Sequence, residues 1–166
     1  MGRIGMLASL VAVTLSGSAL AQDKPLKAQI LGSWDTVSVI QERANDTKVD
    51  LFNGKVSGQQ IYTADGHFSQ MNFQTDRQKL ASGNRQTPTS DEAVALYKQS
   101  YALFGTYTVD EANRTFTIKI TNSTFPNEIG NTQVRKVSFK GNEMIFVNPA
   151  PASGGTGAIN TLVHSK

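Results

Sequence analysis

The sequence predicts an all-β domain, folded as an antiparallel eight-stranded β-barrel with a short N-terminal helix and one internal helix. Short runs rich in β-branched and aromatic residues follow one another, and turn signals such as Asp65-Gly66 and Gly141-Asn142 separate them. Only residues 91–104 have the spacing of a long amphipathic helix. Consecutive antiparallel strands of this kind form an up-and-down barrel or a sandwich, and an eight-stranded barrel holds packed side chains or one small ligand.

The first 21 residues have the layout of a secretory signal peptide. Arg3 supplies the positive charge, residues 4–15 form the apolar segment, and small residues at Ala19 and Ala21 precede the predicted cleavage site before Gln22. The apolar segment is short for a membrane span, and an uncleaved anchor is the alternative. We therefore expect an exported protein, periplasmic or secreted, with a signal peptide over residues 1–21 and one domain over residues 22–166.

The composition argues against several classes of function. The chain has no cysteine, which excludes disulfides and cysteine-based metal sites. Its two histidines, His67 and His164, lie far apart in the sequence, so no metal and no cofactor is predicted. The formal net charge is +3 and the basic residues do not cluster, so nucleic acid is not an expected partner. The expected partner is a small apolar ligand, and the oligomeric state stays open.

In the first half of the domain we expect a short helix, a strand and a hairpin. Apolar residues at helical spacing predict a helix over residues 26–31 that covers one end of the structure. Residues 33–43 follow as a strand, residues 45–58 as a loop, and residues 58–75 as a hairpin that turns at residues 64–66. Alternation along the strand places four residues on one face: Trp34, Thr36, Ser38 and Ile40.

The second half begins with the internal helix, predicted over residues 91–104 with a Thr or Ser cap and acidic residues in its first turn. The pattern then returns to a period of two. It predicts hairpins over residues 106–123 and 133–149 and a final strand over residues 159–166.

Four segments in this order resemble the lipocalin-like domain family of bacteria and fungi, and the match covers most of the chain from Leu31 to Val147. The segments are LGSWDTVSV (Leu31–Val39), SGQQIYTADGHFSQ (Ser57–Gln70), YALFGTYTVDE (Tyr101–Glu111) and STFPNEIGNTQVRKVSF (Ser123–Phe139). The resemblance implies a lipocalin-like β-barrel with an apolar interior. Some relatives act as isomerases or cyclases on apolar intermediates. The chain departs from the family pattern after FPN, where Glu128 and Ile129 replace the usual aromatic residue.

Arg135 is the most prominent candidate for a ligand contact. Alternation places it on one strand face with Gln133, Val137 and Phe139. Its planar fork of N–H donors suits a carboxylate or an enolate inside the barrel. The alternative is a structural Arg that stacks on Trp34 or donates to backbone carbonyls at the closed end. The resemblance favours this alternative, because lipocalins commonly close their barrel with a Trp–Arg packing.

Four further residues complete the predicted ligand-binding set: Tyr62, His67, Tyr107 and Phe125. A tyrosine can present its phenol to a ligand, although half-buried packing with the hydroxyl at the rim is the alternative. His67 follows a tight turn, so it is either a general base aimed into a cavity or an exposed residue at the start of a strand. Phe125 begins the loop Phe125–Gly130, which we expect to form the rim of the pocket.

These observations favour a protein that binds a small apolar or amphipathic molecule in its barrel. No catalytic triad, paired carboxylate or phosphate loop is present at useful spacing, so no catalytic residue is predicted. One alternative is an isomerase or cyclase, which would need at least two of Tyr62, His67 and Arg135 to converge on one cavity. The other is a filled barrel that acts as an interaction module through the polar loop of residues 76–90.

Overall fold

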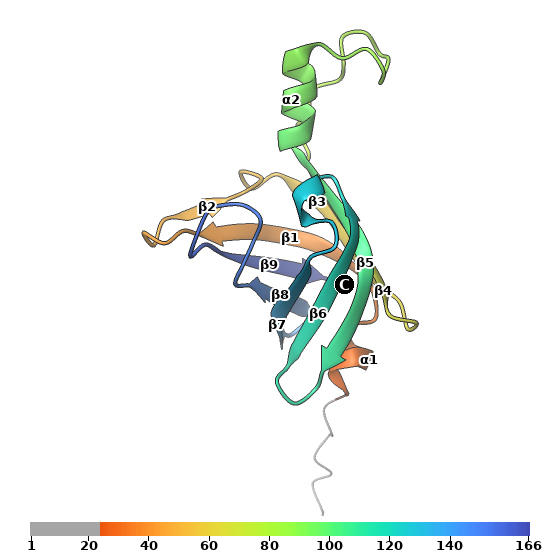
Figure 1. Ribbon diagram of the computed structural model, residues 1–166, viewed down its shortest axis with the longest axis vertical. Helices are drawn as coiled ribbons and strands as arrows, with labels where there is room; N and C mark the ends of the chain where they lie inside the picture. The colour runs from red at the N-terminus through yellow and green to blue at the C-terminus, as the bar shows by residue number, and fades with distance from the viewer. Residues whose placement is uncertain (1–23) are drawn as a thin grey trace, which may run out of the picture.

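Eight antiparallel strands close into a barrel in the computed structural model, which describes residues 24–166 (Figure 1). Each barrel strand pairs with the next, and the last pairs back with the first, placing Leu162 opposite Val39. The predicted barrel is confirmed, whereas the predicted signal peptide over residues 1–21 lies outside the described residues. The barrel strands are β1 (Gly32–Glu42), β3 (Val56–Tyr62), β4 (His67–Gln74), β5 (Ser100–Asp110), β6 (Thr115–Ser123), β7 (Thr132–Lys140), β8 (Glu143–Asn148) and β9 (Ile159–Ser165).

One additional strand, β2 (Lys48–Asp50), interrupts the stretch that the sequence predicts as a loop. β1 pairs with β3 only from Gly32 to Asp35, so one edge of its second half is left without that neighbour. Unpaired backbone groups favour a hydrogen-bonded partner. β2 supplies it by pairing Val49 with Gln41 and Asp50 with Ile40.

The inward face of β1 changes partway along the strand. Trp34 and Thr36 are buried as alternation predicts, but the next buried residues are Val39 and Gln41. The register with β9 shifts between Thr36 and Ser38, which is a β-bulge that places one extra residue in the strand. The predicted common face of Trp34, Thr36, Ser38 and Ile40 is therefore wrong in its second half.

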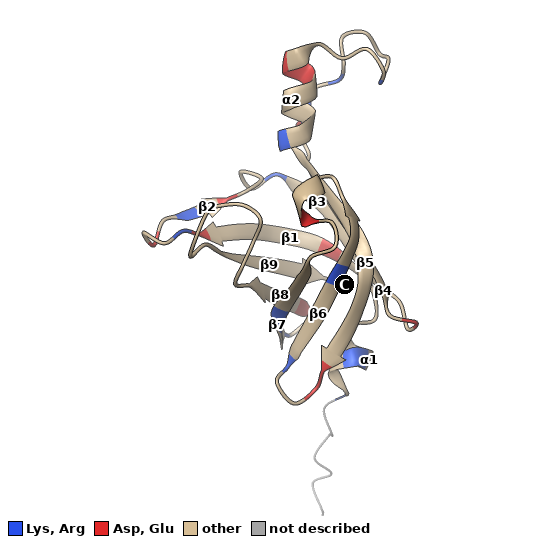
Figure 2. Ribbon diagram, viewed as in Figure 1, with Lys and Arg blue, Asp and Glu red and all other residues tan. Residues whose placement is uncertain are grey.

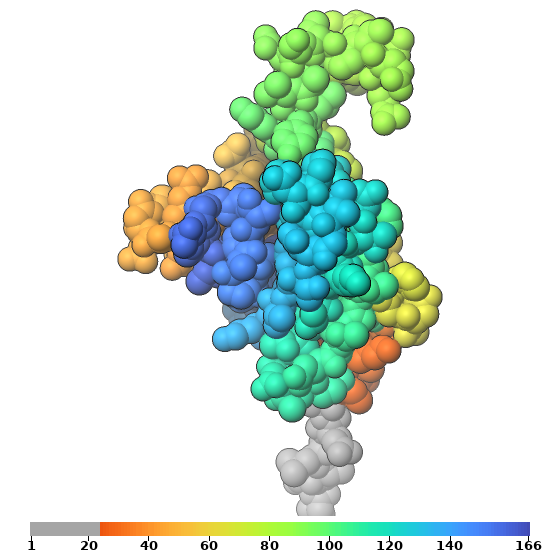
Figure 3. Space-filling model, viewed as in Figure 1, coloured from red at the N-terminus to blue at the C-terminus, as the bar shows by residue number. Residues whose placement is uncertain are grey.

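The internal helix α2 (Ser90–Lys98) is shorter than predicted, because residues 100–104 begin β5 instead. Its N-terminus has the expected cap, since the side chains and backbone N–H groups of Thr89 and Glu92 form a reciprocal capping box. None of its residues is buried, and the helix projects beyond the barrel (Figures 1 and 3). A longer helix would have no packing partner, whereas residues 100–104 form a backbone ladder with β4.

The half of the barrel next to α1 (Leu26–Ile30) is filled by packed aromatic side chains. Tyr62 lies at their centre, with ring centroids 5.3 Å from Tyr107 and 5.8 Å from Phe116. Phe116 in turn lies 4.6 Å from Phe146. α1 covers this end as predicted, because Leu26 and Ile30 are buried against the same core. Packed aromatic rings therefore occupy this half of the barrel.

The cation at the closed end is Lys166. Its Nζ lies 4.4 Å from the centroid of the Trp34 ring and donates to the backbone oxygen of Leu31 at 3.0 Å. The indole N–H of Trp34 donates to the backbone oxygen of Ile30 at 2.8 Å. The alternative in which Arg135 packs on Trp34 is therefore wrong, because Lys166 makes that contact.

Lys and Arg positions and Asp and Glu positions are distributed along the ribbon, over both helices and several strands and turns (Figure 2). The exposed ion pairs include Glu42 with Lys48 at 3.2 Å and Lys55 with Asp76 at 2.6 Å. Exposed pairs of this kind contribute little to stability. The charges that matter for a site lie inside the barrel.

Candidate ligand-binding cavity

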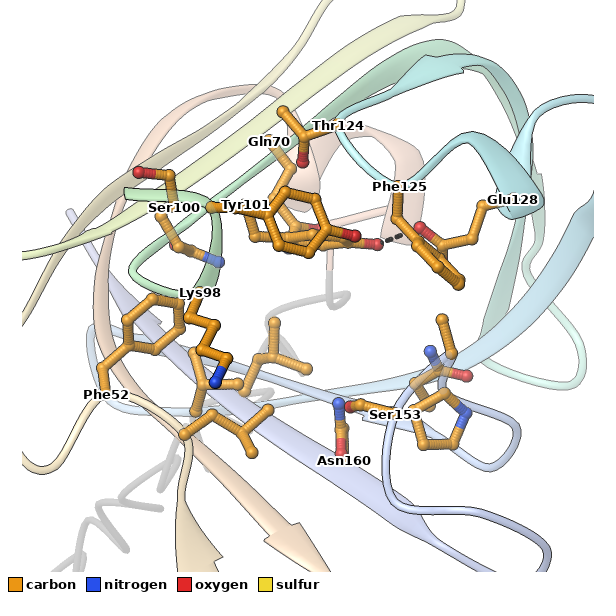
Figure 4. Close-up of a pocket in the computed structure, with 18 of the residues that line it drawn as sticks. Phe52, Gln70, Lys98, Ser100, Tyr101, Thr124, Phe125, Glu128, Ser153 and Asn160 are labelled. Carbon is orange, nitrogen blue, oxygen red and sulfur yellow. Dashed lines mark hydrogen bonds between the residues drawn. The ribbon is translucent and has the colours of Figure 1, made fainter. Parts of the chain in front are cut away.

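A cavity of about 360 Å³ opens at the end of the barrel opposite α1. Residues of the second half of β1, of the start of β5 and of the loop that follows β6 line this cavity. Across the opening in Figure 4, Ser153 and Asn160 face Tyr101 and Thr124. The barrel therefore has two unlike halves, one filled with aromatic rings and one hollow.

Apolar side chains form much of the cavity wall. Phe52 comes from the turn after β2 and is buried, so this turn folds over the rim. Phe125 stands on the opposite loop, immediately before the 3-10 turn η1 (Pro126–Glu128). Of the loop Phe125–Gly130 that the sequence predicts at the rim, Phe125 and Glu128 line the cavity. The apolar lining consists of Val39, Leu51, Phe52, Phe125, Pro151, Ala152 and Leu162.

Arg135 is the buried cation of the cavity, with 3% of its surface exposed. β7 directs it inward, as the alternation of its sequence predicts. Nη1 donates to Gln70 Oε1 at 3.1 Å and Nη2 donates to Gln133 Oε1 at 3.0 Å. Nε is buried and has no partner among the described residues. Both acceptors are neutral amides, and none of the ion pairs within residues 24–166 includes Arg135.

Glu128 is the buried acid of the cavity, and neutral donors surround it. Its Oε2 accepts from the Tyr101 hydroxyl at 2.5 Å and from Ser123 Oγ at 3.2 Å. Its Oε1 accepts from Gln133 Nε2 at 3.2 Å. Burial, reinforced by the hydrogen bond to Glu128, raises the pKa of Tyr101 above its usual value, so this phenol stays protonated. The hydrogen bonds hold η1 against β5, and the carboxylate is satisfied without a cation.

Gln133 connects the two charged residues. Its amide oxygen accepts from Arg135 while its amide nitrogen donates to Glu128. Asn148 Nδ2 adds a second donor to the same oxygen at 3.2 Å. The cation and the acid are thus bridged by an amide and do not contact each other, which leaves the guanidinium without a direct counter-charge.

Below the cavity a second group of polar side chains is fully enclosed. Tyr62 donates to Gln60 Oε1 at 2.6 Å. His164 packs its ring 5.3 Å from that of Phe146, and neither of its ring nitrogens has a partner among the described residues. Burial, with the nearby charge of Arg135, lowers the pKa of His164 to about 3. His164 is therefore neutral at pH 7.

The structure brings two of the five predicted ligand contacts to the cavity, Phe125 and Arg135. Tyr62 and Tyr107 lie in the filled half, where the Tyr107 hydroxyl donates to the backbone oxygen of Thr63 at 2.8 Å. His67 is exposed at the first position of β4, and its Nδ1 lies 3.2 Å from Asp65 Oδ2. These three residues do not line the cavity, and His67 takes the alternative position of an exposed strand-start residue.

The predicted ligand contacts leave out two polar residues of the site, Gln70 and Tyr101, and include Gln133 only as a neighbour of Arg135 on one strand face. The sequence predicts Tyr101 as part of the internal helix, so it does not indicate the contact of Tyr101 with Glu128. Gln70 lies two residues after the buried Phe68 and so shares its inward face of β4, and that spacing is the signal that could have identified it. A glutamine normally marks the solvent face of a strand, which is why the signal is weak.

Residues 24–166 were also compared with the requirements of a metal site and of a membrane-spanning helix. No cluster of three or more His, Cys, Asp or Glu residues there could hold a metal ion. In the same part of the chain, no helix is long and apolar enough to cross a membrane.

Comparison with known families finds a match to the lipocalin-like domain over residues 31–163. Among solved structures, the barrel is similar to a lipocalin-like protein from Bacteroides uniformis ATCC 8492. The two chains are 13% identical, and the alignment covers 81% of this chain and 96% of the other with a TM-score of 0.41. Comparison with curated proteins gives no significant match.

Proposed function

The chain belongs to the lipocalin-like domain family, and from this premise we propose that it binds one small amphipathic molecule in the hollow half of its barrel. The observation that carries the proposal is the cavity of about 360 Å³, which combines apolar walls with a few buried polar groups. That combination is typical of small-molecule sites, in which apolar walls supply affinity and a few polar groups set orientation. As part of the proposal the protein is exported, on the basis of the signal-like layout of residues 1–21.

The geometry favours binding over the isomerase or cyclase alternative. That alternative needs at least two of Tyr62, His67 and Arg135 on one cavity, and only Arg135 lines it. The interaction-module alternative needs a filled barrel, whereas the half beside Phe52 and Phe125 is hollow. Ligand binding needs only the residues that line the cavity, whereas the enzyme alternative needs residues that lie outside it.

Uptake of the neutral fluorescent probe N-phenyl-1-naphthylamine tests the proposal. We expect its emission to rise and saturate at one probe per chain, because a single hollow half shields it from water. Two variants should block uptake by filling the cavity, Val39→Trp on the wall and Ala152→Trp on the rim loop. Val37→Trp is the matched control, because Val37 is 49% exposed on the outside of the same strand.

Each outcome bears on the proposal directly. Folded wild-type protein that takes up no probe would contradict it, and so would equal uptake by all three Trp variants. Circular dichroism confirms that each variant is folded, and the rim variant provides a test even if the wall variant does not fold. Native mass spectrometry of protein purified from its own host should show one bound small molecule.

A further inference from the structure

Resting on the proposed function, we propose that the bound molecule carries a carboxylate and that Arg135 holds it at the floor of the cavity. The inference begins from the charges that line the cavity. Among residues 24–166, the charged residues of the lining are the cations Lys98 and Arg135 and the acid Glu128, which together carry a net charge of +1. An anionic ligand complements that charge.

Arg135 has donors to spare. A guanidinium carries five N–H donors and no acceptor. The structure gives two of them acceptors, the side-chain oxygens of Gln70 and Gln133, and leaves the buried Nε without a partner among the described residues. A buried charge is costly unless an opposite charge or several hydrogen bonds compensate it. The described residues therefore compensate the buried cation only in part.

Glu128 does not fill this role, because its two oxygens already accept three hydrogen bonds from Tyr101, Ser123 and Gln133. Releasing it toward Arg135 would leave those donors unpaired. The other ionisable groups around the guanidinium are neutral: burial raises the pKa of Tyr62 and Tyr101, and burial lowers the pKa of His164 to about 3. A bound anion would supply the counter-charge that these residues do not give Arg135.

The chemistry favours a monocarboxylate over other anions. The planar fork of an arginine matches the two oxygens of a carboxylate. Phosphate has the same fit but carries more charge, and Glu128 in the same cavity repels a second negative charge. With the carboxylate at Arg135, the apolar part of the molecule lies along Phe52 and Phe125 toward the opening.

Displacement of N-phenyl-1-naphthylamine by two matched competitors tests the inference. Dodecanoate and dodecanol share one chain and differ in the head group. For the wild-type protein we expect dodecanoate to displace the probe at a concentration about tenfold or more below that of dodecanol, since hydrogen bonds to charged groups are the stronger ones. Arg135→Met removes the charge at similar length and should abolish the preference for dodecanoate over dodecanol.

Two further variants separate charge from structure. Arg135→Lys keeps the charge without the fork and should retain part of the preference for dodecanoate. Lys136→Met is the matched control, because Lys136 is exposed on the outer face of β7, and it should behave as wild type.

The outcomes distinguish this inference from the proposed function. Probe uptake with equal displacement by acid and alcohol in the wild type would overturn the carboxylate while leaving the binding function intact. An acid preference that survives in folded Arg135→Met would overturn the role of Arg135. No probe uptake by folded wild-type protein would overturn both. The wild-type comparison of acid with alcohol needs no variant, so it decides the ligand class even if Arg135→Met does not fold.

Discussion

His164 should make the stability of the barrel depend on pH. Its pKa is lowered to about 3 in the folded chain, by burial first and by the charge of Arg135 second. In the unfolded chain an ordinary histidine has a pKa of about 6.5. Between these values the unfolded state binds the extra proton, so stability is full above the unfolded pKa and is lost as pH falls toward the folded pKa.

The magnitude follows from the pKa difference. Each pH unit in this window changes the free energy of unfolding by about 1.4 kcal/mol per proton. Acidification from pH 7 to pH 4.5 crosses roughly two units of the window, so His164 should cost about 2 to 3 kcal/mol. At pH 4.5 the folded-state His164 is still mostly neutral, since its pKa is about 3.

Urea denaturation at the two pH values, on the wild type and on His164→Met, measures this contribution. Methionine keeps the buried volume close to that of histidine and cannot titrate. The wild type should lose about 2 to 3 kcal/mol more than the variant, because the titration of the carboxylates is common to both and cancels. His67→Gln is the control, since His67 is exposed, and it should follow the wild type.

An equal loss of stability in the wild type and in His164→Met would refute the reasoning. It would mean that His164 can be protonated inside the folded barrel, and hence that its environment is more polar than the ring of Phe146 beside it suggests.

Three other changes test the fold, each by urea denaturation. Phe146→Ala should lower the free energy of unfolding by about 3 to 5 kcal/mol, because this fully buried ring packs on Phe116 and its loss leaves a cavity. Gly105→Ala should cost about 1 to 3 kcal/mol, because a Cβ there would lie 2.0 Å from the backbone oxygen of Lys119. Val94→Ser should change stability by no more than about 0.5 kcal/mol, because α2 buries none of its residues. A large loss in the last variant would show that α2 packs on the barrel, and unchanged stability in either of the first two would contradict the packing described at that position.

Local patterns predicted most of the strands because each depends on residues close together in the sequence. The turn residues at Asp65-Gly66 and Gly141-Asn142 lie where hairpins turn, and alternation along residues 115–123 correctly identified the buried Phe116, Ile118 and Ile120. The prediction failed at residues 100–104, where apolar residues fit both a helix and a strand. Pairing with β4 decided between them.

The candidate site could be predicted only in part. Arg135 and the Phe125 loop were identified because a charged residue on an apolar strand face and a proline that ends a strand are local signals. Their partners were not identified, because Gln70 lies 65 residues from Arg135 in the sequence. Closure of the barrel brings β4 and β7 to one interior, and no local pattern records which interior residues then meet.

By itself the sequence determined the order of the eight barrel strands, the hairpin turns and the strand face that carries Arg135, because hairpins and alternation are short-range properties of the chain. Only the tertiary structure decided that Lys166, and not Arg135, covers Trp34, and that aromatic rings fill one half of the barrel while the other stays hollow. Those features depend on how side chains from distant strands share one enclosed volume. Packing in that volume is settled by all the strands together.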